Sequence, residues 1–374
     1  MLYMPPLTLA YSTADPPGDS FIQEFDAHIT NAFPKLEQIS PLSSWTRGDI
    51  IEIQGAAASG KTHLLYFWAL TCALPHKTSI TIDRGQKKID LLLGGRNKSV
   101  IVCDCDGHWC LRRLNTIITS YLHNRISKTF PGVSSCTPTI SEMASDALKR
   151  VHTFRPTSTL SLVSTLMAVP EYHRTKMPYE DIGMLMIDGI SSFYWVDRWL
   201  LEQVDDVSET TMKVDPISAA PSEKPQLPKP ILQRADTNPL RHVLTIILQL
   251  RRSLGIVTLL TNWGLTMLDR PPPAPVVYFR QHLRAPYPSP FESEPRSSKF
   301  PLTHHITIPS QGLGPFDEGT TLEEAVEVRE QENRVKGLKM RVIVRTIGKL
   351  PGESPAVVES EFEFAITEDS VLVS

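Results

Sequence analysis

The sequence predicts an α/β protein whose central sheet is mostly parallel, is flanked by helices and ends in antiparallel edge strands at the C-terminus. Three observations support this fold class. Short continuous apolar runs alternate with helical patterns between residues 48 and 262, and a small-residue loop follows the first of these runs. Three more strand patterns, HHITI, MRVIVRT and EFEFAIT, lie near the end of the chain. Strand–helix alternation of this kind produces a right-handed, mostly parallel sheet.

Individual elements follow from local patterns. Buried strands are predicted at residues 50–53, 99–104, 150–154, 182–188 and 256–262, because continuous β-branched and apolar runs suit strands covered on both faces. Helices are predicted from residue 61 to about 74, from 109 to about 126, over 158–169 and from 238 onward. We expect a charged loop at residues 76–98 and a solvated acidic helix at 322–332.

Composition limits the function classes. The 374 residues are 41% hydrophobic and 21% charged, which is typical of a globular chain. A net charge of -3 argues against a protein that coats nucleic acid by bulk charge. No apolar run approaches the ~20 residues that span a bilayer, and no secretory signal precedes the first domain. Five cysteines without a C-x-x-C pair do not suggest a zinc site. We therefore expect an intracellular protein.

The segment GAAASGKT matches the phosphate-binding pattern G-x-x-x-x-G-K-[ST] between a strand and a helix. Small residues allow backbone N–H groups to surround a phosphate, and the helix N-terminus adds a positive dipole. The residues expected to bind ATP are Gly55, Ala58, Ser59, Gly60, Lys61 and Thr62. Lys61 would reach the β/γ-phosphate oxygens, and Thr62 would offer a hydroxyl to Mg²⁺. The alternative is a glycine-rich turn that binds nothing.

Two carboxylates follow apolar strands that are predicted to neighbour this loop. Asp188 ends the strand MLMID and is the candidate second ligand of Mg²⁺; the alternative is a turn residue at the end of a strand. Asp106, in DCDGHW, is the candidate catalytic group that would polarise an attacking water. A solvated helix N-cap would explain Asp106 equally well.

In this order, the segments GDIIEIQGAAASGKTHLLY, DCDGHWCLRRL and MLMIDGISSFYWVDRW resemble the RecA-type recombinase paralogue family of homologous recombination. The resemblance covers roughly residues 40–262. It implies a RecA-like P-loop NTPase core over residues 45–374, with long Pro-rich loops at about 205–236 and 264–303. Residues 1–44 form an N-terminal extension whose amphipathic helix, at 21–33, either packs on the core or docks a partner.

The resemblance also implies a function. The chain would be a nuclear, ATP- and Mg²⁺-binding accessory subunit of a recombinase-paralogue complex. It would help the main recombinase to load onto single-stranded DNA during double-strand break repair, and it would contact single-stranded or branched DNA through the complex. The alternative is an autonomous P-loop enzyme, either a DNA-stimulated ATPase or a small-molecule kinase.

Two residues depart from the pattern of active recombinases. Active recombinases have Glu at the position of Asp106. The side chain of Asp is one methylene shorter, so its carboxylate lies about 1.5 Å further back, and a misplacement of ~1 Å can cost ~100-fold in rate. Active recombinases also have a Gln that senses the γ-phosphate at the position of Trp263. The indole of Trp donates one hydrogen bond and accepts none. Both departures predict weak or partner-dependent ATP hydrolysis with ATP binding retained.

Two aromatic and basic segments are candidate contact sites. The run Phe193, Tyr194 and Trp195 is either an interface with another subunit or part of the core. Arg280 and Arg284 lie among aromatic residues and could contact single-stranded DNA, although the nearby proline run also suits a solvated linker.

Overall fold

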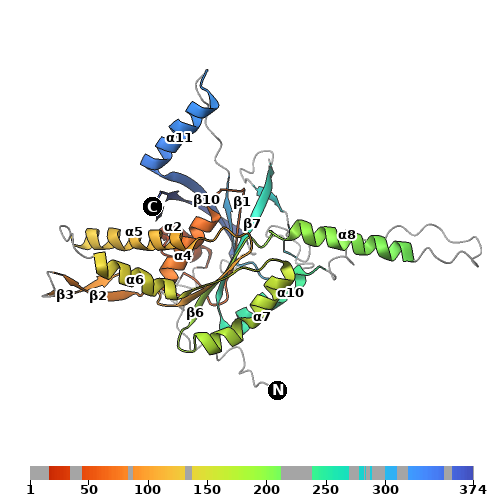
Figure 1. Cartoon of the computed structure of the whole chain (residues 1–374), viewed down its shortest axis with the longest axis horizontal. Helices are drawn as coiled ribbons and strands as arrows, with labels where there is room; N and C mark the ends of the chain where they lie inside the picture. Colours follow the sequence, from red (N-terminus) through yellow and green to blue (C-terminus); the bar gives the residue numbers. More distant parts are fainter. Residues whose placement is uncertain are drawn as a thin grey trace, which may run out of the picture.

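A computed structural model describes the chain over residues 17–33, 44–82, 87–130, 137–211, 238–268, 278–281, 283, 287–288, 300–309, 319–348 and 356–373. It has a mixed α/β fold with a large, mostly parallel sheet between layers of helices (Figure 1). The predicted fold class is confirmed at this level.

Within the described residues, ten strands form the main sheet, in the order β12-β11-β10-β9-β1-β7-β6-β4-β5, with β8 paired to β7. The parallel strands are β9 (His304–Ile308), β1 (Ile50–Gly55), β7 (Val257–Leu268), β6 (Ile182–Asp188), β4 (Ser99–Asp104) and β5 (Val151–Phe154). The antiparallel strands are β10 (Leu338–Gly348), β11 (Ala356–Ile366), β12 (Val371–Val373) and β8 (Tyr278–Gln281).

Helices cover both faces of the sheet. The helices are α2 (Gln23–Ala32), α4 (Lys61–Ala73), α5 (Leu111–Thr129), α6 (Thr137–Lys149), α7 (Thr159–Lys176), α8 (Tyr194–Thr211), α10 (Leu240–Leu254) and α11 (Leu322–Lys336). Alternate residues of β4 point to opposite faces: Val100 and Val102 join the core under α4, α5 and α6, whereas Ile101 and Cys103 join the core under α7 and α10. This double burial explains why the central strands have continuous apolar sequences.

Several elements differ from the sequence-based expectations. Within residues 76–98, expected as a charged loop, β2 (Lys77–Ile82) and β3 (Lys87–Leu92) pair antiparallel in a separate two-stranded sheet (Figure 1). Strand β9, expected at the antiparallel edge, pairs in parallel with β1. Helix α8 extends to Thr211, into the loop predicted at about 205–236, and the rest of that prediction lies outside the described residues. Strands β7 and β8 occupy parts of the predicted loop 264–303, and most of its remainder also lies outside the described residues.

Helix α2 packs against the core, so the structure favours the packing interpretation of this segment. Phe25 is fully buried, and its ring lies 5.3 Å from that of Trp45 and 5.9 Å from that of Trp68 in α4. Trp45 and Trp68 meet edge to face at 5.5 Å. This aromatic cluster joins the N-terminal segment to α4, the helix that follows the GAAASGKT segment.

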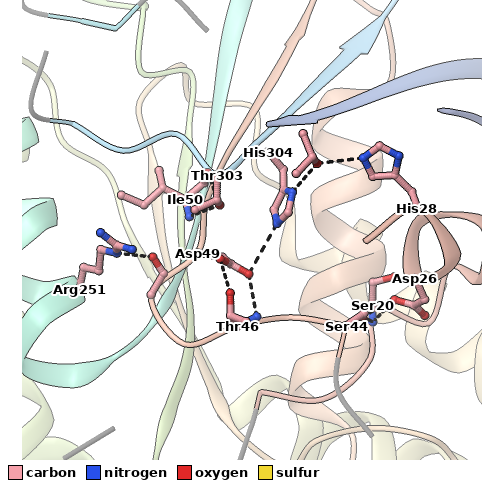
Figure 2. A network of polar contacts seen from close by, with 12 residues as sticks. Ser20, Asp26, His28, Ser44, Thr46, Asp49, Ile50, Arg251, Thr303 and His304 are labelled. Carbon is pink, nitrogen blue, oxygen red and sulfur yellow. Dashed lines mark hydrogen bonds and ion pairs between the residues drawn. The ribbon is translucent and has the colours of Figure 1, made fainter. Parts of the chain in front are cut away.

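A chain of buried polar groups also holds α2 in place (Figure 2). Asp49 lies 3.7 Å from His304 Nε2, and His304 Nδ1 is 2.7 Å from the hydroxyl of Thr346. The same hydroxyl is 2.9 Å from His28 Nε2, and His28 Nδ1 is 2.7 Å from Ser360 Oγ. Burial, together with the neighbouring His304, lowers the pKa of His28 to about 4, so its imidazole is neutral at physiological pH.

The single hydroxyl proton of Thr346 sets the direction of this chain, because it can donate to only one of the two imidazoles. If Nε2–H of His304 faces Asp49, which lies 3.7 Å away, Nδ1 of His304 accepts the Thr346 proton. In that arrangement His28 donates from Nε2 to Thr346 and accepts from Ser360 at Nδ1, so each proton between Thr346, His28 and Ser360 has an acceptor.

Candidate functional site

The loop between β1 and α4 has no space for side chains at two of its glycines. A Cβ atom on Gly55 would lie 2.4 Å from Ser59 Oγ. Gly60 has φ +86°, and a Cβ there would lie 3.0 Å from Ile366 and 3.1 Å from Phe364. Ala58 also adopts positive φ, at 58°. The resulting turn leads directly into α4, whose first N–H groups have no acceptor within the helix and are available to an anion.

Lys61 lies at this helix N-terminus, and the residue is only 8% exposed. Its Nζ donates to the carbonyl oxygens of Gly55, at 2.9 Å, and Ala56, at 2.6 Å. Burial lowers the pKa of Lys61 to about 8, although the carboxylates of Asp188 and Asp106 act in the opposite direction. The amine is thus held within the loop by neutral oxygens, which a phosphate oxygen could replace with a stronger, charge-assisted hydrogen bond.

Thr62 and Asp188 meet beside the loop. Thr62 Oγ1 donates to Asp188 Oδ2 at 2.8 Å, and Thr261 Oγ1 donates to Asp188 Oδ1 at 2.7 Å. Burial raises the pKa of Asp188 to about 6, and the charge of Asp106 adds to this effect. Strands β1, β7 and β6 are neighbours in the sheet. Thr261 within β7, Asp188 at the end of β6 and Thr62 on the helix that follows β1 therefore come together.

This arrangement fits an ATP–Mg²⁺ site. Thr62 and Asp188 present adjacent hydroxyl and carboxylate oxygens, the ligand types that Mg²⁺ prefers, and phosphates and water normally complete its octahedron. In the described part of the chain, no group of three His, Cys, Asp or Glu side chains is placed to hold a metal ion by itself. A metal at this position would therefore arrive with the nucleotide, held by Thr62 and Asp188.

Asp106 lies close to the same site. A Cβ atom on Gly189, the residue after Asp188, would be 3.4 Å from the Asp106 side chain. Asp106 Oδ1 accepts the backbone N–H of His108 at 3.2 Å. Helix α5 begins at Leu111 with Cys110 at its N-cap, so Asp106 does not cap that helix and the capping interpretation is wrong.

Asp104, two residues earlier, is a buried carboxylate that the sequence analysis did not select. Its side chain has no exposed surface, and Oδ2 lies 3.2 Å from Nε of Arg155. Arg155 also donates to the carbonyl oxygen of Trp109 at 3.2 Å. The sequence signal was available, because Asp104 ends an apolar strand as Asp188 does, and the two are paired in register. Asp104 is thus paired with Arg155, whereas Asp188 and Asp106 are the carboxylates whose charges act on the amine of Lys61.

Trp263 lies next to the loop, paired in register with Gly55 on β1. Its side chain is 37% exposed, and its backbone N–H donates to Ser191 Oγ at 3.1 Å. The preceding residue, Asn262, is fully buried and donates from Nδ2 to Glu52 Oε1 at 2.8 Å. The indole thus occupies the strand position where the resemblance predicts a γ-phosphate-sensing amide.

Beneath the loop, Glu52 is a fully buried carboxyl group in β1 that sequence reasoning also missed. Burial raises its pKa to about 7. Its Oε2 lies 3.4 Å from Nε2 of His305 in β9, whose pKa burial lowers to about 3. Both groups are therefore neutral between these two values, and the pair is a polar part of the core rather than an ion pair.

The aromatic run at the start of α8 divides into two parts. Phe193 and Tyr194 are partly buried and pack against the core under α7 and α10, whereas Trp195 is 54% exposed. Of the DNA candidates, Arg280 lies in β8 and Arg284 lies outside the described residues. In the described part of the chain, no helix is long and apolar enough to cross a membrane.

Proteins similar to this chain include two DNA repair proteins. The DNA repair protein XRCC2 homolog of Arabidopsis thaliana is 29% identical over 173 residues, covering 40% of this chain and 42% of that protein. The DNA repair protein XRCC2 of Mus musculus is 27% identical over 151 residues, covering 40% of this chain and 43% of that protein. The chain is close to the XRCC2-like RecA paralogues. These matches span less than half of each relative, and no protein-family model matches the chain.

Proposed function

We propose that this protein is an ATP-binding accessory subunit of a recombinase-paralogue complex in nuclear DNA repair by homologous recombination. It would assist the loading of the main recombinase on single-stranded DNA. The observation that carries the nucleotide part is the hydrogen bond between Thr62 and Asp188 beside the buried amine of Lys61. Similarity to two DNA repair proteins supports the repair context.

In this proposal, nucleotide serves mainly to shape the subunit. Lys61 and the N-terminus of α4 bind phosphate, and Thr62 and Asp188 hold the metal that accompanies it. Bound Mg²⁺ would neutralise phosphate charge. Asp106 and Trp263 differ from the groups that act in the transition state of active recombinases, so hydrolysis is slow. Loss of transition-state contacts with ground-state contacts retained lowers turnover more than affinity.

A titration of fluorescent ATP with Mg²⁺ tests the nucleotide part. Lys61→Ala should abolish binding, because it removes the cation aimed at the β/γ-phosphates. Lys149→Ala, which changes an exposed lysine of α6, is the matched control and should bind like wild type. Equal affinities for wild type and Lys61→Ala would contradict the phosphate role.

Steady-state turnover, with and without single-stranded DNA, separates the accessory subunit from an autonomous enzyme. The isolated chain should turn over far more slowly than ~1 s⁻¹, the lower end for ordinary enzymes. A rate at or above that value for the chain alone would favour the autonomous enzyme. Co-purification with other recombinase-paralogue subunits tests the complex itself, and failure with every subunit would contradict it.

A further inference from the structure

Helix α8 carries an exposed stripe of large apolar side chains. Trp195, Val196, Trp199 and Leu200 are between 50% and 60% exposed. The two tryptophans are four residues apart, as are Val196 and Leu200, so all four lie on one face of the helix. In Figure 1 the helix extends away from the sheet and its covering helices. Contiguous exposed apolar surface of this kind marks an interaction site.

The base of α8 is fixed to the rest of the molecule. Phe193 and Tyr194 pack against the core under α7 and α10. One turn further along, Asp197 accepts a hydrogen bond from Thr159 Oγ1 at 2.5 Å, at the start of α7. The stripe therefore lies on a helix that is already anchored, so less conformational entropy of this chain is lost when a partner binds.

The charge of α8 indicates what kind of partner fits. Between Tyr194 and Thr211 the sequence has five acidic residues and one basic residue, a net charge of -4. The single arginine, Arg198, pairs with Glu202 at 2.8 Å and lies over the ring of Trp195 at 5.6 Å. An acidic helix repels both DNA phosphates and a second copy of itself, whereas it attracts a basic surface.

We propose that the stripe of Trp195, Val196, Trp199 and Leu200 docks into an apolar groove, rimmed by Lys and Arg, on another protein subunit. An amphipathic helix in an apolar groove is a common recognition mode, and Trp is enriched among the residues that dominate binding energy. The inference rests on the proposed function in one respect: the subunit would be another member of the recombinase-paralogue complex.

The test uses the full chain co-expressed with each other recombinase-paralogue subunit from the same organism, followed by affinity measurement on the pair that forms. The double variant Trp195→Ala/Trp199→Ala should bind about 30-fold or more weakly, equivalent to ~2 kcal/mol, with an unchanged melting temperature. Tyr179→Ala, which truncates an aromatic residue that is 98% exposed elsewhere, should bind like wild type. Glu202→Lys and added salt should each also weaken binding.

Each other outcome overturns the inference. Unchanged affinity in the double variant would remove the stripe from the interface while leaving the complex and ATP binding intact. A lowered melting temperature would mean that the tryptophans are core residues. Loss of oligonucleotide binding in the double variant would assign the stripe to single-stranded DNA, and loss of a dimer in sedimentation would assign it to a second copy. Failure of the wild-type chain to bind any subunit would overturn the complex as well.

Discussion

Replacing Glu52 with glutamine is expected to remove a pH dependence from the stability of the fold. Glu52 is fully buried in β1, where Asn262 donates to its Oε1 at 2.8 Å and His305 Nε2 lies 3.4 Å from its Oε2. Burial raises its pKa from 4.5 to about 7. A glutamine has nearly the same shape, can still accept from Asn262, and has no proton to lose.

The sign follows from linkage. Because the folded-state pKa is raised above the unfolded value, the stabilisation linked to Glu52 is fully present below about pH 4.5 and is lost as the pH rises through about 7. The shift is about 2.5 pKa units, and each unit corresponds to ~1.36 kcal/mol. The free energy of unfolding of Glu52→Gln should therefore rise relative to wild type by about 3 kcal/mol between pH 4.5 and 8.

Urea unfolding at a series of pH values measures this difference directly. The control is Glu142→Gln, which changes an exposed residue of α6 and should give a curve parallel to that of wild type. If Glu52→Gln also runs parallel to wild type, Glu52 titrates alike in the folded and unfolded chains. The argument from burial would then be wrong.

Three further predictions follow from the described contacts. ATP–Mg²⁺ affinity should fall below about pH 6, where Asp188 takes up a proton, and above about pH 8, where Lys61 loses one; a flat profile in titrations would contradict both assignments. Asp106→Glu combined with Trp263→Gln should raise steady-state turnover of ATP. An unchanged rate would show that these two residues are not the cause of slow hydrolysis. Thr346→Val should cost about 2–4 kcal/mol in urea unfolding, because two buried imidazoles lose a partner, and a cost below ~0.5 kcal/mol would refute the polar chain.

The parallel part of the sheet could be predicted from sequence because each central strand is covered on both faces. Double burial gives a continuous apolar run such as Val100–Cys103 in β4, which is easy to see in a sequence. Strand β9 was assigned to the antiparallel edge because the order of strands along the chain does not say which neighbour a strand joins. Its place beside β1 depends on the side at which the chain re-enters the sheet.

Elements with weak or mixed patterns were missed. The strand pair β2–β3 contains several lysines, so the segment that includes KTSITI was interpreted as a charged loop. Helix α6 was not predicted, although its sequence TPTISEMASDALK has apolar residues at helical spacing. The first residues of the expected loop after Asp188 continue the helix α8 instead. In each case tertiary packing supports an element that local propensity leaves undecided.

The candidate site divides in the same way. Gly55 to Thr62 could be found because the loop is contiguous in sequence, and Asp188 because it ends a strand. Thr261 and Glu52 could not be found in this way, since their roles depend on which residues are adjacent across strands β1, β6 and β7. The sequence of one strand alone does not determine its register against a neighbouring parallel strand.

The positions of Asp106 and Trp263, the two residues that differ from active recombinases, indicate which groups could make ATP hydrolysis faster. Asp106 follows β4 and Trp263 lies in β7, and these strands flank β6, which carries Asp188. The changes therefore lie on both sides of Asp188, the carboxylate that we propose holds the metal, while Lys61 and Thr62 on the first turn of α4 are those the motif requires. Trp263 is partly exposed, so another molecule can reach the side of the sheet where the parallel strands end. If the proposed complex hydrolyses ATP at this site, the neighbouring subunit must contribute the missing transition-state groups from this side of the sheet.

Turnover in the complex should then respond to mutations in the partner and vanish with Lys61→Ala in this chain. Turnover that survives Lys61→Ala would place the working site elsewhere in the complex.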